Sequence, residues 1–426
     1  MKKYPAYKDS GVDWLGEIPE HWETKRSKFL WFETTNLSED GNEQLLSVSQ
    51  YDGVKTNKNQ SRSENLIGYK KVCKDNLVTN IMLAWLGGLG ISNFDGVVSP
   101  AYSIYQASNE ILPRFAHYLY RTKIYLDEFA RRSSGVVPSR WRMYTDDFGE
   151  VRTVLPPKPE QEAIAHFLDD TCEKLDKVVA QKEKMMALLK ERKQALIQKA
   201  VTRGLDENVD FKDSGVDWIG EIPVGWEVKR LKHLTTKIGS GVTPSGGGTT
   251  YLSKGIPLLR SQNILFDKIE LSNVAYISKK IHNSMSNSKV YKGDVLLNIT
   301  GGSLGRCYFH MGENEMNVNQ HVCILRPSLK VTTVYLNALI ASEIGQKQIW
   351  FFQQGGGREG LNFASLKNFL FPVPEIKEQN KISKYIQTQS KKIDQAVSQQ
   401  EQAIVKLREY KASLIDSCVL GKIKVT

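Results

Sequence analysis

Two Glu-x-Lys pairs come closest to a catalytic pattern in this chain of 426 residues. They are Glu191 with Lys193 and Glu409 with Lys411. A nuclease site would also need acidic residues to hold a metal ion, and neither pair has an Asp partner nearby in sequence. Both pairs lie in long stretches with a helical pattern, where charged side chains face solvent or a neighbouring helix. We interpret them as surface or interhelical charges.

Other catalytic and cofactor motifs are missing from the sequence. It has no GxxxxGK[ST] phosphate loop, no HExxH, and no Asn-Pro-Pro or Asp-Pro-Pro followed by an aromatic residue. Glycine runs at residues 87–90, 301–305 and 355–357 lack the strand-to-helix context of a nucleotide site. Turns or mobile loops explain them better. We therefore expect no catalytic residue, no metal site and no cofactor in this chain.

Five scattered cysteines predict neither a disulfide framework nor a zinc site, because no CxxC pair occurs. No apolar run approaches the roughly 18 to 20 residues that span a bilayer, and we expect a cytoplasmic protein. The formal net charge of +11 is the more informative property. A basic protein of this size often meets a polyanion, because each neutralised phosphate releases a counterion.

The chain is an internal duplication. The sequence KDSGVDWLGEIP at residues 8–19 recurs as KDSGVDWIGEIP at residues 212–223, and we call these two segments the twin motifs. A second pair of similar segments begins at Leu155 and Val373, where the offset is 218. Each repeat therefore contains a twin motif, a variable block and a long helical segment.

The helical segments have apolar residues spaced mostly by three and four. We predict helices over residues 160–203 and 378–420, each long enough for a coiled coil. The variable blocks mix short β-rich runs with helical stretches. The predicted class is α+β: two mixed α/β domains joined by two long helices in an antiparallel coiled coil. The predicted boundaries are 1–154 for the first domain with its motif, 155–205 for a helical spacer, 206–372 for the second domain with its motif, and 373–426 for the second spacer.

These features resemble the specificity subunits of type I restriction-modification systems. The resemblance rests on the twin motifs, on LPPKPEQEAIAHFLD and VPEIKEQNKISKYI before the helices, and on IGSGVTPSGG, IPLLRSQNI, KGDVLLNITGGSLGRC and NVNQHVCILRP in the second block. It covers nearly the whole chain, although the first block lacks a GxTPS stretch.

The resemblance implies a non-catalytic protein that holds two target-recognition domains on an antiparallel helix pair. Each domain would read one half of a bipartite site in double-stranded DNA. The implied partners are methyltransferase subunits, expected to be two, which methylate adenine with S-adenosylmethionine, and restriction subunits that translocate and cut DNA with ATP.

The resemblance places base reading in the two variable blocks. Arginine, asparagine and glutamine read guanine and adenine edges, while lysine and serine mostly hold phosphates. For any single residue, a solvated charge or an internal ion pair is an equally good interpretation. The candidates are Arg62, Lys70, Lys71, Arg131, Arg132, Ser134, Arg140 and Arg142 in the first block, and Arg260, Gln262, Asn263, Arg306 and Arg358 in the second.

The twin motifs supply candidate scaffold residues. We expect hydrophobic anchors that dock on the helix ends, and the alternative is a surface for two identical partner subunits. Lys182 and Gln400 interrupt the apolar stripes near the helix midpoints, and we predict that they lie near each other. The anchors are Trp14, Ile18 and Trp22, with Trp218, Ile222 and Trp226 as their equivalents.

Two other functions remain open at this point. The chain could be a stand-alone bipartite DNA-binding or architectural protein without a methyltransferase partner. It could also be a coiled-coil adaptor whose basic charge is incidental, in which case DNA binding would depend weakly on salt.

Overall fold

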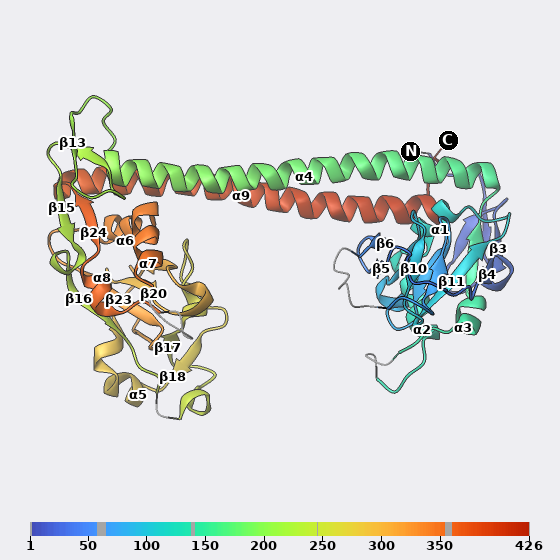
Figure 1. The fold of residues 1–426 in the computed structure, drawn as a ribbon, viewed down its shortest axis with the longest axis horizontal. Coiled ribbons are helices and arrows are strands. Elements are labelled where there is room, and N and C mark those ends of the chain that lie inside the picture. The colour runs from blue at the N-terminus through green and yellow to red at the C-terminus, as the bar shows by residue number, and fades with distance from the viewer. Residues whose placement is uncertain (1, 58–64, 138–140, 245, 354–359, 426) are drawn as a thin grey trace. The chain divides into compact units, whose positions relative to one another are not determined.

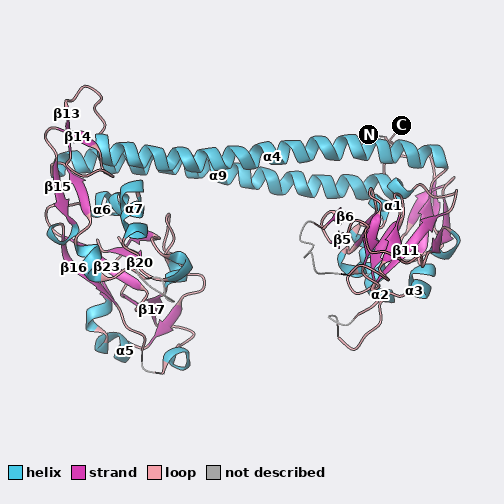
Figure 2. Cartoon of the chain, viewed as in Figure 1, coloured by secondary structure: helices cyan, strands magenta, loops and turns pink. Residues whose placement is uncertain are grey.

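The computed structural model describes residues 2–57, 65–137, 141–244, 246–353 and 360–425 and contains both α-helices and β-strands (Figures 1 and 2). The chain divides into two compact units. Unit 1 comprises Met1–Glu183 and Glu401–Thr426, and unit 2 comprises Lys184–Gln400. Each unit contains one variable block and a stretch of both long helices, so the C-terminal part of the chain completes the unit that the N-terminal part begins.

The described residues of unit 1 form short strands and three short α-helices besides its share of the long ones. The helices are α1 (Pro113–Leu119), α2 (Lys123–Arg132) and α3 (Thr145–Gly149). The strands are β1 (Tyr7–Asp9), β2 (Glu17–Pro19), β3 (Glu23–Arg26), β4 (Trp31–Glu33), β5 (Leu46–Ser49), β6 (Gly53–Thr56), β7 (Lys70–Val72), β8 (Leu77–Asn80), β9 (Leu89–Ile91), β10 (Gly96–Val98), β11 (Tyr102–Ala107) and β12 (Arg152–Leu155).

The main sheet of unit 1 is antiparallel and has the order β4-β11-β8-β9. Strand β8 is buried along its whole length, which fits an inner strand covered on both faces. Aromatic residues of α1 and α2, among them Phe115, Tyr125 and Phe129, belong to the same buried cluster as Leu77 of β8. The helices therefore pack against the sheet and fix the loops that connect its strands.

Unit 2 repeats this arrangement with different sequences. Its short helices are α5 (Lys279–Ser284), α6 (Thr333–Ala341), α7 (Glu343–Phe351) and α8 (Phe363–Lys367). Its strands are β13 (Phe211–Asp213), β14 (Glu221–Pro223), β15 (Glu227–Arg230), β16 (Thr235–Ser240), β17 (Ile256–Leu259), β18 (Ala275–Ile277), β19 (Lys289–Val290), β20 (Val295–Asn298), β21 (Cys307–Phe309), β22 (Met316–Val318), β23 (Val322–Pro327) and β24 (Leu370–Val373).

The order β16-β23-β20-β21 matches the main sheet of unit 1 strand for strand. A second four-stranded sheet has the order β18-β17-β22-β19, in which β17 runs parallel to β22. In both units a short pair, β3-β12 or β15-β24, joins the segment after the twin motif to the segment before a long helix. The main sheets of the two variable blocks therefore share one topology despite their different sequences.

The long helices are α4 (Lys158–Arg203) and α9 (Ile376–Val419), and they pack against each other (Figure 1). In unit 1, Asp176 from the first half of α4 pairs with Lys411 from the last part of α9. In unit 2, Lys193 from the last part of α4 pairs with Asp394 from the first half of α9. The helices are therefore antiparallel, which confirms the predicted fold class. Each starts two residues before the predicted position.

None of the helices within the described part of the chain combines the length and the apolar character needed to cross a bilayer.

Candidate nucleic-acid interface

A buried glutamate in α2 holds two of the candidate arginines of unit 1. The Glu128 side chain is 1% exposed, and Arg131 Nε and Nη2 donate to it at 2.6 and 2.8 Å. Arg132 Nε donates to Glu128 Oε1. Burial raises the pKa of Glu128, but hydrogen bonds from both guanidiniums outweigh burial and hold the pKa below its ordinary value. Arg131 and Arg132 therefore both form ion pairs with Glu128, which stabilise the fold of unit 1.

The segment after α2 presents a different arginine at the surface. Ser134 and Arg142 exchange backbone hydrogen bonds of 3.0 and 2.9 Å, which close the loop between them. Trp141 packs on Trp85 with ring centroids 5.3 Å apart. The Arg142 side chain is exposed, and it has no ion-pair partner among the described residues. The Arg142 backbone is thus fixed by hydrogen bonds, while its guanidinium is exposed and has no ion-pair partner among the described residues.

The two candidate lysines of unit 1 lie on β7 and already have protein partners. Lys70 Nζ donates to the Tyr102 carbonyl at 2.8 Å, and Lys71 Nζ lies 3.4 Å from Glu43. The pKa of Glu43 lies below its ordinary value, chiefly because Ser38 donates a hydrogen bond to it. Arg62 and Arg140 are outside the described residues.

In unit 2 the candidates at residues 260–263 separate into surface and interior positions. Asn263 is 1% exposed; its Oδ1 accepts from the Arg260 backbone N–H and its Nδ2 donates to the Glu270 carbonyl. Both ends of this amide stabilise the turn, and a role of Asn263 in base reading stays a prediction. Gln262 is exposed.

Arg260 and Arg306 are intermediate cases. Arg260 Nη2 donates to the Asn273 carbonyl at 3.0 Å, and the guanidinium lies 5.8 Å from the Tyr251 ring centroid. Arg306 is half-buried just before β21, and its backbone carbonyl accepts from Asn298. Its side chain has no partner within the described ranges. Arg358 lies outside those ranges.

The twin motifs lie against the ends of the long helices. The Trp22 indole N–H donates to Glu160 Oε2 at 2.9 Å in unit 1, and the Trp226 indole N–H donates to Glu378 Oε2 at 3.1 Å in unit 2. Ile18 and Ile222 are buried in the hydrophobic clusters that contain the same tryptophans. In each unit the tryptophan three residues after the twin motif thus contacts the glutamate at the start of one long helix.

The other tryptophan of each motif differs between the units. Trp14 packs edge-on against Tyr125 with ring centroids 5.1 Å apart. Trp218 is 38% exposed and lies 6.2 Å from Phe351. Lys182 belongs to unit 1 and Gln400 to unit 2, and their proximity stays a prediction.

Two buried glutamines complete the scaffold and had no role in the sequence prediction. Gln161 accepts from the Leu112 N–H and donates to the carbonyls of Glu110 and Pro156. Gln379 repeats all three bonds in unit 2 with equivalent backbone groups. The signal was present, because both glutamines follow a glutamate at the same place in the repeat.

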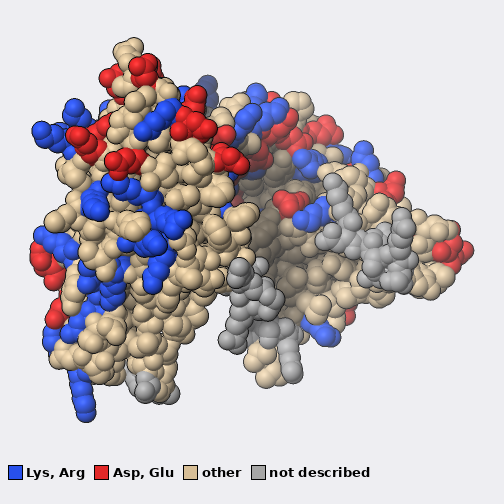
Figure 3. Space-filling view, turned by 60° about the vertical axis from the view of Figure 1, so that its left-hand side comes forward, with Lys and Arg blue, Asp and Glu red and all other residues tan. Residues whose placement is uncertain are grey.

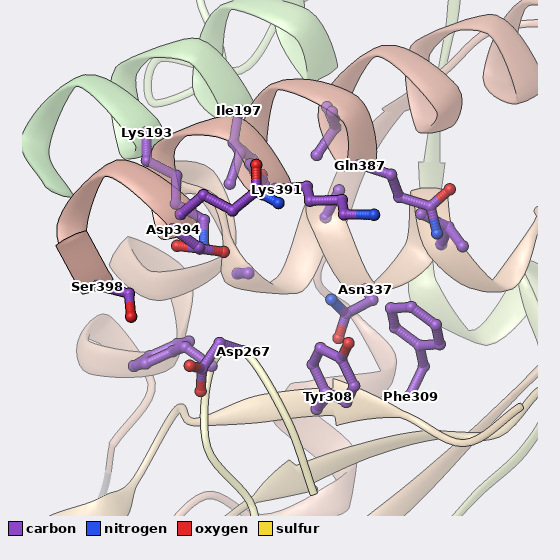
Figure 4. A pocket seen from close by; sticks show the side chains of 17 residues that line it. Lys193, Ile197, Asp267, Tyr308, Phe309, Asn337, Gln387, Lys391, Asp394 and Ser398 are labelled. Carbon is purple, nitrogen blue, oxygen red and sulfur yellow. The ribbon is translucent and has the colours of Figure 1, made fainter. Parts of the chain in front are cut away.

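Unit 2 also contains a cavity of about 540 Å³ beside α6, α9 and β21. Figure 4 shows Tyr308, Phe309 and Asn337 facing Lys193 and Asp394 across it. The Asn337 Oδ1 atom is buried and has no hydrogen-bond partner among the described residues. Unsatisfied buried amides are uncommon, so this oxygen is the most unusual polar atom of the cavity.

The repeat explains why the cavity exists. In unit 1 the equivalent positions carry Arg114 and Tyr118, which both hydrogen-bond to Asp169 at 2.7 Å. In unit 2 the same positions are Val334, Ala338 and Gln387, and all three line the cavity. Smaller or uncharged side chains therefore leave open a space that unit 1 fills. The cavity contains none of the predicted DNA-binding residues.

Comparison with known proteins finds specificity subunits of type I restriction enzymes. A family described as the type I restriction modification DNA specificity domain matches residues 223–404. The EcoBI type I restriction enzyme specificity subunit of Escherichia coli is 28% identical over 63% of this chain and 58% of its own length. A chain described as the MjaX specificity subunit of Methanocaldococcus jannaschii is 22% identical and covers 96% of both chains.

Solved structures show the same fold. A chain from work on complex assembly and conformational transition of the type I R-M system superposes with a TM-score of 0.70 at 14% identity, covering 94% of this chain and 98% of its own. The HsdS subunit of Thermoanaerobacter tengcongensis gives a TM-score of 0.51 at 15% identity, covering 95% and 98%. The EcoBI alignment spans less than two thirds of that relative. By its duplicated scaffold, its fold and these matches, the chain is similar to the specificity subunits of type I restriction-modification systems.

Proposed function

We propose that this chain is the DNA-recognition subunit of a type I restriction-modification complex. The two recognition domains, residues 1–154 and 206–372, each read one half of a bipartite target in double-stranded DNA. Methyltransferase subunits, two in number, dock on the repeated scaffold, and restriction subunits join the full complex in the cytoplasm. The chain itself contributes recognition and no catalysis.

The observation that carries this proposal is the contrast between scaffold and surface. The scaffold contacts recur in both units, as the Trp22–Glu160 and Trp226–Glu378 hydrogen bonds do. The exposed candidates do not recur: unit 1 presents Arg142 in the segment before α3, and unit 2 presents Gln262 in the turn after β17. A repeated scaffold suits two identical partners, whereas different surfaces suit two different half-sites.

The deciding experiment is a methylome of the host with and without this gene, paired with purification of the tagged chain. We expect a bipartite methylated sequence that disappears with the gene, and a methyltransferase that co-purifies. Sequence-specific DNA binding without any methylation would instead indicate a stand-alone DNA-binding protein. Binding that depends weakly on salt and ignores sequence would indicate an adaptor.

The absence of catalysis has its own test. The purified chain, supplied with S-adenosylmethionine, ATP and target DNA, should neither methylate nor cleave the DNA until the partner subunits are added. Methyl transfer by the chain alone would contradict the proposal.

A further inference from the structure

A group of three basic residues follows the twin motif in both units. Unit 1 has Lys25, Arg26 and Lys28 in the sequence ETKRSK, and unit 2 has EVKRLK at the equivalent positions. The two groups also occupy the same place in the fold, since β3 pairs with β12 as β15 pairs with β24, residue for residue. Any difference between these two surfaces must therefore come from the residues around the groups.

In unit 1 two glutamates neutralise the group. Lys25 Nζ bonds to Glu110, and Lys28 Nζ lies 2.7 Å from Glu150. Arg26 Nε lies 3.3 Å from the other oxygen of Glu150. The pKa of Glu150 lies below its ordinary value, first because Lys28 donates a hydrogen bond to it. This surface thus carries internal ion pairs.

In unit 2 neither glutamate has an acidic equivalent. The backbone carbonyl of Glu110 accepts from Gln161, and in unit 2 the residue whose carbonyl accepts from Gln379 is Lys330. Glu150 caps the C-terminal end of α3, and Asn368 caps the equivalent end of α8. Two acidic positions have therefore become one basic and one neutral position.

The unit 2 surface keeps one carboxylate among several cations. Glu227 pairs with Lys229 at 2.8 Å. Lys330 occupies the position of Glu110, which bonds Lys25 in unit 1, and Lys25 is the equivalent of Lys229. The hydrogen bond from Lys229 first, and then the charges of Lys229, Lys212 and Lys330, hold the pKa of Glu227 below its ordinary value. We call the residues Lys229, Arg230, Lys232 and Lys330 the basic face of unit 2.

Three members of the basic face are free to bind a partner. Arg230, Lys232 and Lys330 are exposed, and in the part of the chain that the structure describes none of them has an ion-pair partner. Figure 3 shows Lys and Arg side chains gathered on the side of unit 2 that comes forward, with acidic side chains concentrated above them. Arg230 ends strand β15, Lys232 lies in the short turn that follows it, and Lys330 lies in the loop before α6. Exposed lysine and arginine without acidic partners suit contacts to phosphates.

We propose that the basic face of unit 2 holds the phosphate backbone of duplex DNA without reading its sequence, and that the equivalent face of unit 1 does not. The inference rests on the proposed function and extends it to a surface outside the predicted base-reading residues. Phosphate is favoured over an acidic protein because the face presents separate point charges, and each phosphate that they neutralise releases a counterion.

The test transplants the acidic residues of unit 1 into unit 2. The variant Lys330→Glu/Asn368→Glu gives unit 2 the two glutamates that unit 1 has at the equivalent positions. Because unit 1 folds with these glutamates, the variant should also fold, and circular dichroism and thermal melting check this. The full chain with its co-purifying subunits is titrated with target duplex at several salt concentrations. We expect the slope of log K against log salt to become shallower by about two, because about two phosphate contacts are lost. The methylated sequence should not change.

A reciprocal variant supplies the matched control. Glu110→Lys/Glu150→Asn in unit 1 should steepen the salt dependence, since it frees the group that those glutamates neutralise. An unchanged salt slope in the unit 2 variant would overturn the inference. If the variant also lost a co-purifying subunit, the basic face would instead be a binding surface for that protein. If the wild-type complex shows no target-specific binding at all, the proposed function fails instead.

Discussion

Lys193 Nζ donates to both carboxylate oxygens of Asp394, at 2.8 and 2.7 Å, and Lys411 Nζ donates to both oxygens of Asp176, at 2.7 Å each. The second bridge is the duplicate of the first with the roles of the two helices exchanged. Each unit therefore has its own copy of one interhelical contact. This assigns the lysines of both Glu-x-Lys pairs to helix pairing, as the sequence indicated.

The two bridges should contribute equally little to stability. Double-mutant cycles with Lys193→Met and Asp394→Asn, and with Lys411→Met and Asp176→Asn, should each give a coupling free energy of about 0.2–1 kcal/mol, because these pairs are partly exposed. Denaturant unfolding at low and high salt measures it, and salt should weaken both. A coupling free energy above about 3 kcal/mol in either cycle would contradict this interpretation. Glu191→Gln is the control and should have no effect.

Glu160 should matter more than its equivalent Glu378. Glu160 accepts hydrogen bonds from Tyr4, His21 and Trp22, whereas Glu378 accepts from Trp226. We expect Glu160→Ala to cost about 2–3 kcal/mol and Glu378→Ala about 1 kcal/mol of unfolding free energy. Thermal melts of both variants against wild type measure this difference, and equal losses would contradict it.

The acid sensitivity of unit 1 offers a second measurement on Glu160. Burial raises its pKa, but the three hydrogen bonds outweigh burial and hold the pKa below its ordinary value. A carboxyl with a lowered folded pKa stabilises the protein above its unfolded pKa, and that contribution is lost as pH falls through the folded pKa. Below about pH 4.5, Glu160→Gln should therefore lose stability less steeply than wild type.

His117 should give a loss of stability at milder acidity. Burial, with help from the charges of Arg121 and Arg114, lowers its pKa to about 3 against the opposing charge of Asp169. His117 takes up a proton near pH 6.5 in the unfolded chain but stays neutral in the folded chain at that pH. The free energy of unfolding therefore falls as pH drops below 6.5.

The equivalent residue in unit 2 supplies the variant that tests this. His117→Asn installs the amide found at Asn337, which can still accept from the Ile91 N–H that His117 Nδ1 binds at 3.2 Å. Between pH 7 and pH 5, the unfolding free energy of wild type should fall by up to about 1.4 kcal/mol per pH unit more than that of the variant. Parallel pH profiles would contradict the prediction.

Arg131 and Arg142 should separate stability from recognition. Arg131→Ala removes one partner of the buried Glu128 and should lower the melting temperature. Arg142→Ala should leave the melting temperature unchanged and relax one half of the methylated sequence, because its guanidinium has no ion-pair partner among the described residues. Sequencing of methylated sites decides this, and loss of specificity at both halves would contradict separate reading by the two units.

The scaffold could be predicted because the duplication repeats its residues in both halves of the sequence. Helix α4 starts at Lys158, earlier than the apolar spacing predicts, and it includes Pro159 because a proline is tolerated in the first helical turn. The ion pairs of Arg131 and Arg132 follow from their spacing to Glu128 along a helix and could have been predicted.

Other features depend on contacts between segments far apart in the sequence. The burial of Asn263 depends on the turn that returns to Glu270, and the cavity depends on three substitutions in α6 and α9. The position of Lys330 near Glu227 depends on a pairing that no local pattern encodes. The sequence therefore predicted the architecture more fully than the recognition surface.

The ends of the chain pair with each other in unit 1. The Lys424 N–H donates to the Lys2 carbonyl at 2.8 Å, where the end of α9 leads back toward β1. In unit 2 the same junction is the continuous segment 204–210 between α4 and β13. Gly421 and Gly204 make the same left-handed turn, with φ of 71° and 73°. The junction between a long helix and the strand that follows it is therefore built in the same way in both units, and a circular permutant that joins residues 424 and 2 and is opened at residues 204–210 should keep the same fold with its halves exchanged.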